Sequence, residues 1–214
     1  MSINKYIYKS IKGGKRIENQ DSFLIIDDNE FSFFAIFDGV GGALNGKKAS
    51  NFAKKFIKNK FSNYLGQEIR LKEMMFDLNN DLVSSYFKEA FTTYCFIFMQ
   101  RNNNEIYYSW LGDSRIYEIT NQFMESITID DSINKNVINK FLGDDQLSIN
   151  DFRLCTTPKE NKYFLLCTDG FYNILESNKL AFFKEFNKKY ITKIKIDSLV
   201  NGLNEDDSTY IFIK

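Results

Sequence analysis

The chain has 214 residues, of which 43% are hydrophobic and 26% charged, a composition that is ordinary for a folded globular protein and excludes wholesale disorder. Lysine plus arginine and aspartate plus glutamate number 28 each, so no excess charge favours nucleic acid or an anionic membrane as a partner. The sequence contains no histidine, which excludes zinc sites of the usual kind and catalytic triads built on imidazole. Any catalysis must therefore rest on carboxylates, lysine, arginine or a hard metal ion bound through oxygen.

The same sequence indicates where the protein works. No apolar run approaches the length of a membrane span, and the N-terminus has no signal-peptide pattern. The cysteines are odd in number, widely spaced and set in mostly apolar surroundings, at Cys95, Cys155 and Cys167. Such cysteines are typical of reduced thiols in a protein core. We expect a cytoplasmic protein in which residues 1–214 form one domain.

The first part of the chain is predicted to form strands. Residues 3–8 favour a short strand, and the glycine pair at 13–14 marks a turn. Residues 23–26 and 31–37 favour two antiparallel strands joined by a polar turn at 27–30. The second of these strands is apolar almost throughout, which indicates a strand buried on both faces.

This hairpin brings two aspartates to the same place. Asp21 precedes its first strand and Asp38 follows its second, and these positions lie at the same end of an antiparallel pair. A buried carboxylate is unfavourable without a partner, and the partner that we favour is a metal ion. The loop at 39–42 is rich in glycine but lacks the lysine and the hydroxyl residue of a nucleotide P-loop, so we do not expect a nucleotide there.

Helices and further strands are predicted along the rest of the chain. Apolar residues at helical spacing favour two long helices, over 43–65 and within 67–90, and two successive helices among strands favour a layered α+β fold over βαβ units. A strand meander is expected within 91–128, with strands at 94–99, 106–111 and 115–119. Single strands are expected further along, at 148–155 (half-exposed), 163–168 (buried) and 210–213. Later helices are expected at 129–142, 171–176, around 180–190 and around 198–204.

Two more aspartates stand at strand ends. The buried strand at 163–168 runs into Asp169, which repeats the pattern at Asp38, and Asp206 precedes the last strand. Four clustered carboxylates would resist one another's ionisation without a counter-ion. Two Mn²⁺ or Mg²⁺ ions would cancel this charge through the hard oxygen ligands that they prefer, and could activate a water for attack on a phosphate ester. Arg16 is the candidate group for the substrate phosphate, because its planar fork can hold two oxygens.

Five short motifs in this order resemble those of the metal-dependent protein serine/threonine phosphatases of type 2C, in their bacterial form. They span nearly the whole chain and comprise Arg16 with Asn19-Gln20-Asp21, Phe37-Asp38-Gly39-Val40-Gly41-Gly42, Gly112-Asp113-Ser114-Arg115, Thr168-Asp169-Gly170 and Asp206-Asp207-Ser208-Thr209. The resemblance implies a four-layer α-β-β-α sandwich of two antiparallel sheets flanked by helices, with the metal ions at one end of the sheets.

The resemblance also implies a role for each site residue. Asp38 would bridge two ions, with the backbone carbonyl of Gly39 on one of them, and catalysis would depend on Asp38 and Asp169. Asp21, Asp169 and Asp206 would complete the site of these two ions. Asp113 would bind a third, more weakly held ion together with Asp169, and Arg16 would hold the substrate phosphate.

The chain departs from the family pattern at four places. Val40 stands where many eukaryotic members have a histidine acid, and the Asp-His-Ser segment of the family is reduced to Asp130-Asp131-Ser132. The region 126–169 is short, which predicts a shortened flap beside the site. Asp207 stands where the family usually has asparagine, which leaves open which carboxylate of the Asp206–Asp207 pair binds metal.

Two functions remain open at this stage. The first is hydrolysis of phosphoserine and phosphothreonine in proteins, with a phosphorylated protein as the substrate and a serine/threonine kinase as a further candidate partner. The alternative is a pseudophosphatase that acts as a binding or regulatory module, which the short flap motivates. The four core aspartates and Arg16 argue against that alternative, because a module without metal gains nothing from clustered acids.

Overall fold

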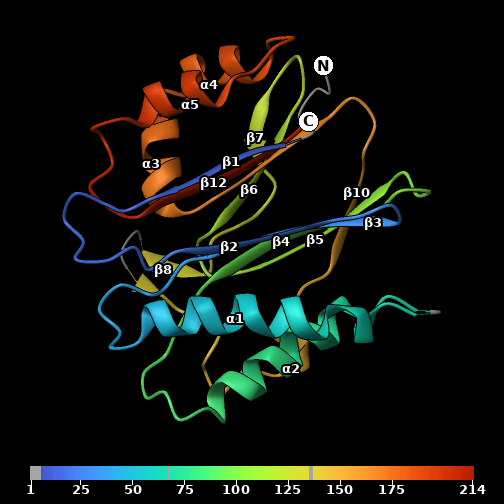
Figure 1. Cartoon of the computed structure of the whole chain (residues 1–214), viewed down its shortest axis with the longest axis vertical. Helices are drawn as coiled ribbons and strands as arrows, with labels where there is room; N and C mark the ends of the chain where they lie inside the picture. Colours follow the sequence, from blue (N-terminus) through green and yellow to red (C-terminus); the bar gives the residue numbers. More distant parts are fainter. Residues whose placement is uncertain (1–5, 67, 135–136) are drawn as a thin grey trace.

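The computed structural model describes residues 6–66, 68–134 and 137–214. Two five-stranded antiparallel sheets lie face to face at the centre of the molecule (Figure 1). The first sheet has the order β1 (Tyr6–Ile11), β12 (Ser208–Ile213), β11 (Tyr163–Cys167), β6 (Arg115–Ile119) and β7 (Met124–Ser126). The second has the order β10 (Cys155–Pro158), β5 (Glu105–Leu111), β4 (Tyr94–Gln100), β3 (Phe31–Phe37) and β2 (Ser22–Asp27).

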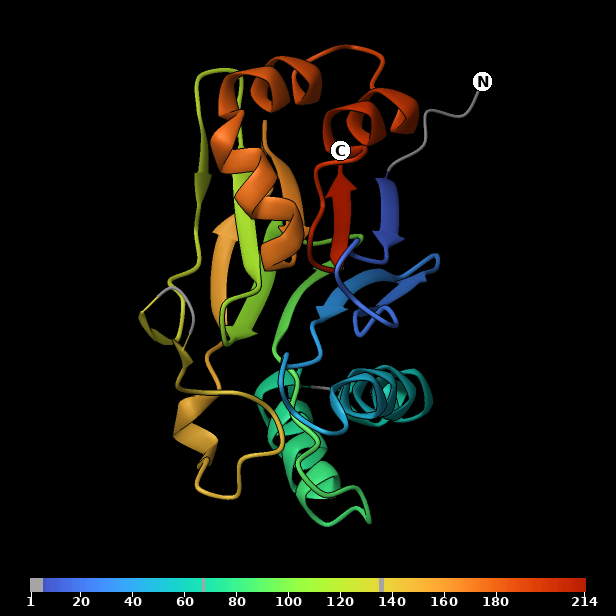
Figure 2. The ribbon, with the colours of Figure 1, turned by 90° about the vertical axis from the view of Figure 1, so that its left-hand side faces the viewer.

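Helices cover the outer face of each sheet, as Figures 1 and 2 show. The second sheet is covered by α1 (Gly46–Lys60), a 3₁₀ turn η1 (Phe61–Tyr64) and α2 (Leu71–Val83). The first sheet is covered by α3 (Asp169–Ser177), α4 (Lys179–Phe186) and α5 (Lys193–Val200). The predicted four-layer α-β-β-α sandwich is therefore confirmed. None of the helices formed by the described residues is long and apolar enough to span a membrane.

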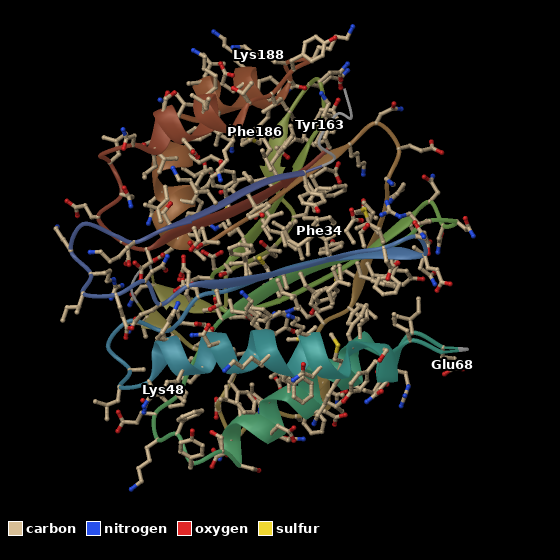
Figure 3. All side chains as sticks on the ribbon, in the orientation of Figure 1. Phe34, Lys48, Glu68, Tyr163, Phe186 and Lys188 are labelled. Atoms are coloured by element: carbon tan, nitrogen blue, oxygen red, sulfur yellow. The ribbon has the colours of Figure 1, made fainter. Side chains whose placement is uncertain are left out.

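Apolar side chains fill each of the three spaces between the layers (Figure 3). The position of β3 explains why its sequence is apolar. Phe33, Ala35 and Phe37 pack toward α1 and α2. Its intervening residues Phe34 and Ile36 pack between the two sheets. Both faces of the strand are buried, as predicted for such a run.

The pairing of strands brings the predicted acids to one end of the sandwich. Ser22 pairs with Phe37 in the β2–β3 hairpin, so Asp21 and Asp38 extend from the same end, as expected. Cys167 pairs with Tyr210 between β11 and β12, and the backbone N–H of Thr168 donates to the carbonyl of Thr209 at 3.1 Å. The residues that follow β11 and precede β12 therefore also lie at one end of their sheet.

The predicted meander within 91–128 is wrong in its second half. Strands β4 and β5 pair, but β5 and β6 belong to different sheets, and residues 112–114 carry the chain from one to the other. Gly112 makes this crossover possible, because its φ of +95° is left-handed and a Cβ would lie 2.6 Å from Cγ2 of Thr93. Apolar strands give no sign of which neighbour they pair with, so the sequence favoured the nearest one.

The helix predicted at 129–142 is also wrong. The described part of this segment holds a small antiparallel pair, β8 (Ser132–Asn134) and β9 (Val137–Ile138). Its apolar residues do not form a buried stripe, since Ile129 and Ile133 are exposed. Ion pairs fix its start instead, as described below. Residues 135 and 136 lie outside the described residues.

The strand predicted at 148–155 forms mostly other structure. A 3₁₀ turn η2 (Ile149–Asp151) begins the segment, with Ser148 and Asp151 forming a reciprocal capping box. The strand β10 starts only at Cys155. Because the capping residues are polar and lie among apolar ones, the segment has the alternating polar and apolar residues that are typical of a half-exposed strand.

The other predicted elements form with shifted ends. The helix predicted at 43–65 divides into α1 and η1, and the one within 67–90 ends at Val83, leaving Tyr86 exposed beyond it. The C-terminal helices and the strand predicted at 3–8 move by a few residues, and residues 1–5 and 67 lie outside the described part of the chain. These shifts are typical of element boundaries.

Candidate metal centre

Five carboxylates approach one another at one end of the sandwich. The pKa of Asp38 is raised well above its ordinary value by burial and by its neighbours, which are Asp21, Asp169, Asp113 and Asp206 in decreasing order of effect. All predicted acidic site residues are thus close enough to act on one carboxyl group. The sequence placed them at strand ends, and the structure brings those ends together.

Asp21 is the most deeply buried of these acids, with 3% of its surface exposed. Its Oδ2 accepts hydrogen bonds from Oγ1 of Thr209 at 2.6 Å and Oγ1 of Thr168 at 3.0 Å. Its Oδ1 is buried and has no hydrogen-bond partner among the described residues. Burial, which outweighs these two hydrogen bonds, raises the pKa of Asp21 above its ordinary value.

The backbone around Asp38 is held by the residues that precede β4. The carbonyl of Asp38 accepts a hydrogen bond from the backbone N–H of Thr93 at 2.8 Å and from Oγ1 of Thr92 at 2.7 Å. Gly39 then bridges to Thr92, and the N–H of Val40 donates to the carbonyl of Phe91 at 3.0 Å. The position of the Asp38 carboxylate is therefore set by rigid backbone on both sides.

Asp113 and Asp169 line a cavity of about 300 Å³. Asp113, in the crossover between the sheets, is 8% exposed, and burial together with Asp169 and Asp130 raises its pKa to about 7. Asp169 is the first residue of α3, where the helix dipole favours a negative charge. Burial and Asp206 nevertheless raise the pKa of Asp169, while the N–H of Gly170 and the charge of Arg16 lower it.

The wall of this cavity includes an ordered arginine. Arg115 donates to both oxygens of Asp130 at 2.9 and 2.7 Å, and its guanidinium lies 3.8 Å from the ring centre of Tyr172. Asp131 accepts two hydrogen bonds from Arg153 in the same way, at 2.8 and 2.6 Å. These pairs fix the start of the segment that was predicted as a helix.

Arg16 lies at the edge of the acidic cluster and is paired with Asp206. Its Nε and Nη2 donate to the two oxygens of Asp206 at 2.5 and 2.6 Å, and both side chains remain about one third exposed, at 33% and 35%. Hydrogen bonding to Asp206 raises the pKa of Arg16. Beside this pair, Lys15 donates to Glu205 at 2.6 Å. The predicted phosphate ligand and one predicted metal ligand therefore hold each other.

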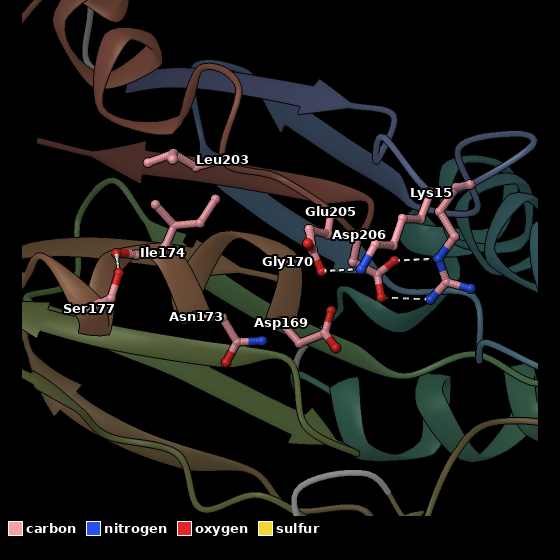
Figure 4. Close-up of a pocket in the computed structure, with 10 residues that line it drawn as sticks. Lys15, Asp169, Gly170, Asn173, Ile174, Ser177, Leu203, Glu205 and Asp206 are labelled. Carbon is pink, nitrogen blue, oxygen red and sulfur yellow. Dashed lines mark hydrogen bonds and ion pairs between the residues drawn. The ribbon is translucent and has the colours of Figure 1, made fainter.

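A cavity of about 720 Å³ opens from this ion pair (Figure 4). Its polar end is formed by Arg16, Asp206 and Asp169, and its other end by Ile174 and Leu203. Figure 4 shows Asp169, at the start of α3, and Asp206, in the loop before β12, facing the same space. A ligand in this cavity would meet both an arginine and the acidic cluster.

Sequence reasoning missed the residues that hold the acids in place. Thr168 and Thr209 bind Asp21, and Asp207 accepts backbone N–H groups, as described below. The signal was available, because a threonine adjoins the aspartate of one motif and ends another. What the sequence does not show is that these two hydroxyls converge on Asp21, which lies 147 residues before Thr168 and 188 residues before Thr209.

The donor chemistry of this cluster fits hard divalent cations. All the side-chain donors are carboxylate oxygens, burial disfavours their negative charge, and Oδ1 of Asp21 is left without a partner within the described residues. Over the same residues, no three acidic or cysteine side chains are yet arranged so that they could hold an ion as they stand. The chemistry of the cluster therefore fits Mn²⁺ or Mg²⁺, and coordination would need the side chains to move.

Comparisons with known proteins agree with this description. The sequence model of protein phosphatase 2C matches residues 13–195. A protein of Mycoplasma pneumoniae that is provisionally named a protein phosphatase is 26% identical, over 96% of this chain and 95% of that protein. The crystal structure of the serine/threonine phosphatase Stp1 from Staphylococcus aureus is similar with a TM-score of 0.80 at 20% identity, covering 98% of this chain and 94% of that one.

A further structure is that of the catalytic domain of the serine/threonine protein phosphatase PstP in complex with two manganese ions. It gives a TM-score of 0.77 at 19% identity and covers 97% of this chain and 96% of that one. At such identities the two structures show a common fold. The family match covers most of the chain, so the resemblance inferred from the five motifs is confirmed.

Proposed function

The chain belongs to the protein phosphatase 2C family, and we propose that it hydrolyses phosphoserine and phosphothreonine in proteins. The observation that carries this proposal is the cluster of carboxylates beside Arg16. Asp21, Asp38 and Asp113 are held where burial disfavours their charge, and an arginine stands next to them. This arrangement suits a site that binds cations first and a phosphate group second.

The metal ligands proposed are those expected from the sequence. Asp38 and the carbonyl of Gly39 would hold ions together with Asp21, Asp169 and Asp206, and Asp113 would contribute to a third, weaker site. All of these proposed ligands are oxygen atoms, which supports Mn²⁺ or Mg²⁺ as the bound ions. Two bound ions would supply the positive charge that neutralises the phosphate group and the acidity that makes water a nucleophile at neutral pH.

Arg16 is proposed to hold the phosphate of the substrate. Its guanidinium already makes two parallel hydrogen bonds to a pair of oxygens, which is the geometry that a phosphate would use. Because both side chains are partly exposed, Arg16 can exchange Asp206 for a phosphate at modest cost. This exchange would also free the oxygens of Asp206 for a cation.

The leaving hydroxyl group needs a proton that position 40 does not supply. Val40 carries no acid, and its N–H is committed to the carbonyl of Phe91. The chain resembles bacterial members of the family in this respect. The cavity beside Asp169 is open enough to admit a seryl or threonyl side chain with its phosphate.

The test is turnover of a phosphoserine or phosphothreonine peptide by the purified full chain. Hydrolysis is expected only with Mn²⁺ or Mg²⁺, and it should stop on addition of a chelator and in Asp38→Ala and Asp169→Ala. A folded protein that binds metal but does not turn over any such peptide would contradict the proposal and would favour the binding-module alternative. A single domain, a shortened flap, a cytoplasmic location and a kinase partner stay predictions from the sequence.

A further inference from the structure

The loop that carries Arg16 is attached to the loop that precedes β12. The backbone N–H of Gly13 donates to Oδ1 of Asp207 at 2.8 Å, and the N–H of Gln20 donates to Oδ2 of Asp207 at 2.7 Å. One carboxylate thus joins the two ends of the loop at 13–20. Between these ends, the N–H of Lys15 donates to the carbonyl of Glu205 at 3.0 Å.

Both carboxylate oxygens of Asp207 are used to hold the loop at 13–20. It is 3% exposed, and each of its two oxygens accepts a hydrogen bond from a backbone N–H. An asparagine has one acceptor oxygen, so it could accept from only one of the two N–H groups and would turn an NH₂ group toward the other. Both oxygens of Asp207 are directed at backbone N–H groups and Asp207 does not line the cavity, whereas Asp206 does.

The guanidinium of Arg16 lies directly against Gly41. A Cβ at position 41 would lie 2.9 Å from Nη2 and 3.0 Å from Nη1 of Arg16. The backbone of Gly41 is not in the left-handed region, so its conformation does not require glycine. The lack of a side chain there matters because it leaves room for the arginine.

We propose that Asp207 and Gly41 are positioning residues that hold the Arg16 guanidinium in place, and that they set the affinity for a phosphate group without binding metal themselves. Asp207 fixes the loop from which Arg16 extends, and Gly41 forms the surface on which its guanidinium rests. The inference rests on the proposed function in one respect, namely that a phosphate group is the ligand of Arg16. It also resolves the choice between the two adjacent acids, with Asp206 as the metal ligand.

The first experiment is calorimetric titration of inorganic phosphate into the Mg²⁺-saturated full chain. Asp207→Asn should weaken phosphate binding roughly tenfold, because a hydrogen bond to a charged acceptor is lost. Affinity for Mn²⁺, titrated separately, should stay within about twofold. Asp28→Asn is the matched control, since Asp28 also accepts two backbone N–H groups but lies in the turn at the far end of the β2–β3 hairpin.

The decisive readout is coupling to Arg16. In an Arg16→Ala background, adding Asp207→Asn should change phosphate affinity by less than about twofold, because the group that it positions is gone. An equal loss in both backgrounds, an unchanged affinity in the single variant or a strong loss of Mn²⁺ affinity overturns the inference. In the first two of these cases, turnover by the wild-type chain would leave the proposed function intact.

Gly41→Ala tests the same inference without touching Asp207. The clash is with the end of a flexible side chain, so the protein should fold, but the guanidinium must move and phosphate affinity should fall several-fold. Gly66→Ala is the matched control, because a Cβ there meets no atom within 4 Å. Unchanged phosphate affinity in Gly41→Ala overturns the role of Gly41. Metal binding without phosphate binding in the wild-type chain overturns both the inference and the proposed role of Arg16.

Discussion

Asp21 and Asp113 are buried and Asp38 is half-buried among other carboxylates, whereas Asp206 is paired with Arg16 at the edge of an open cavity. We call the first group the acidic half and the second the paired half. The acidic half carries charge that burial disfavours and that a bound cation would relieve. The paired half is neutral within itself and exposed, so it can exchange partners. Cation binding should therefore depend mainly on the first, with Asp206 as a further ligand, and phosphate binding should depend on Arg16 in the second.

The largest expected effect is that of Asp38→Asn on turnover. Removing the proposed bridging carboxylate should lower kcat at least about a thousandfold, because the charge stabilisation supplied by bound ions is worth several kcal/mol. The metal-free variant should also be more stable than the wild-type chain, since a disfavoured buried charge is gone. Steady-state kinetics and thermal unfolding check the two parts. A variant that keeps a tenth of the activity would contradict the division into halves.

The second effect is stabilisation by the cation. At a free Mn²⁺ concentration one hundred times its Kd, the free energy of unfolding should rise by about 2.7 kcal/mol. The rise should be much smaller in Asp38→Asn and unchanged in Arg16→Ala if the two halves act separately. Denaturant unfolding with and without Mn²⁺ measures this. Equal stabilisation of all three proteins would show that the cation binds elsewhere.

The third effect is an unusual dependence of stability on pH. Burial raises the pKa of Asp113 to about 7 from an ordinary 3.8, so between these values the folded chain binds more protons than the unfolded one. The free energy of unfolding of the metal-free protein should therefore fall as pH rises through this window and level off above it. Asp113→Asn should reduce the slope. A metal-free protein whose stability rises steadily from pH 4 to 7 would argue against a strained acidic half.

The smallest effect is expected in the paired half. Arg16→Lys keeps the charge but loses the planar fork, so KM for a phosphopeptide should rise roughly tenfold while the free energy of unfolding changes by less than about 1 kcal/mol. Arg101→Lys is a suitable control, because Arg101 pairs with Asp27 at similar exposure at the other end of β2. A loss of stability in Arg16→Lys well beyond that of Arg101→Lys would mean that the pair is structural.

Much of the acidic half could be predicted from the sequence because Asp21 and Asp38 flank the strands of one hairpin, whereas Asp113 was implied only by the resemblance to the family. An apolar run that stops at Asp38 defines a buried strand and a charge at its end, and the same pattern recurs at Asp169. Antiparallel pairing then places Asp21 beside Asp38 without further information. Local pattern and simple geometry were sufficient there.

The paired half and the segment 126–155 could be predicted much less well. The contact of Asp207 with Gly13 joins residues 194 positions apart, and nothing in the local pattern of either announces it. The segment at 129–142 has the apolar spacing of a helix, but side-chain pairs such as Arg115–Asp130 and Arg153–Asp131 decide its course. Long-range polar contacts of this kind override local propensity, and a single sequence does not reveal them.

The pairing of β1 with β12 has a consequence for how the protein is made. Tyr6 lies opposite Ile213, so β1 finds this partner only after residues 208–213 have been synthesised. The loops at 13–20 and 204–207 meet beside this pairing, so the Arg16 loop stays unanchored until then. Contacts between such distant segments also form slowly during refolding. We therefore expect nascent chains to acquire the ability to bind a phosphate group only after residues 204–213 have been synthesised, later than the formation of the β2–β3 hairpin.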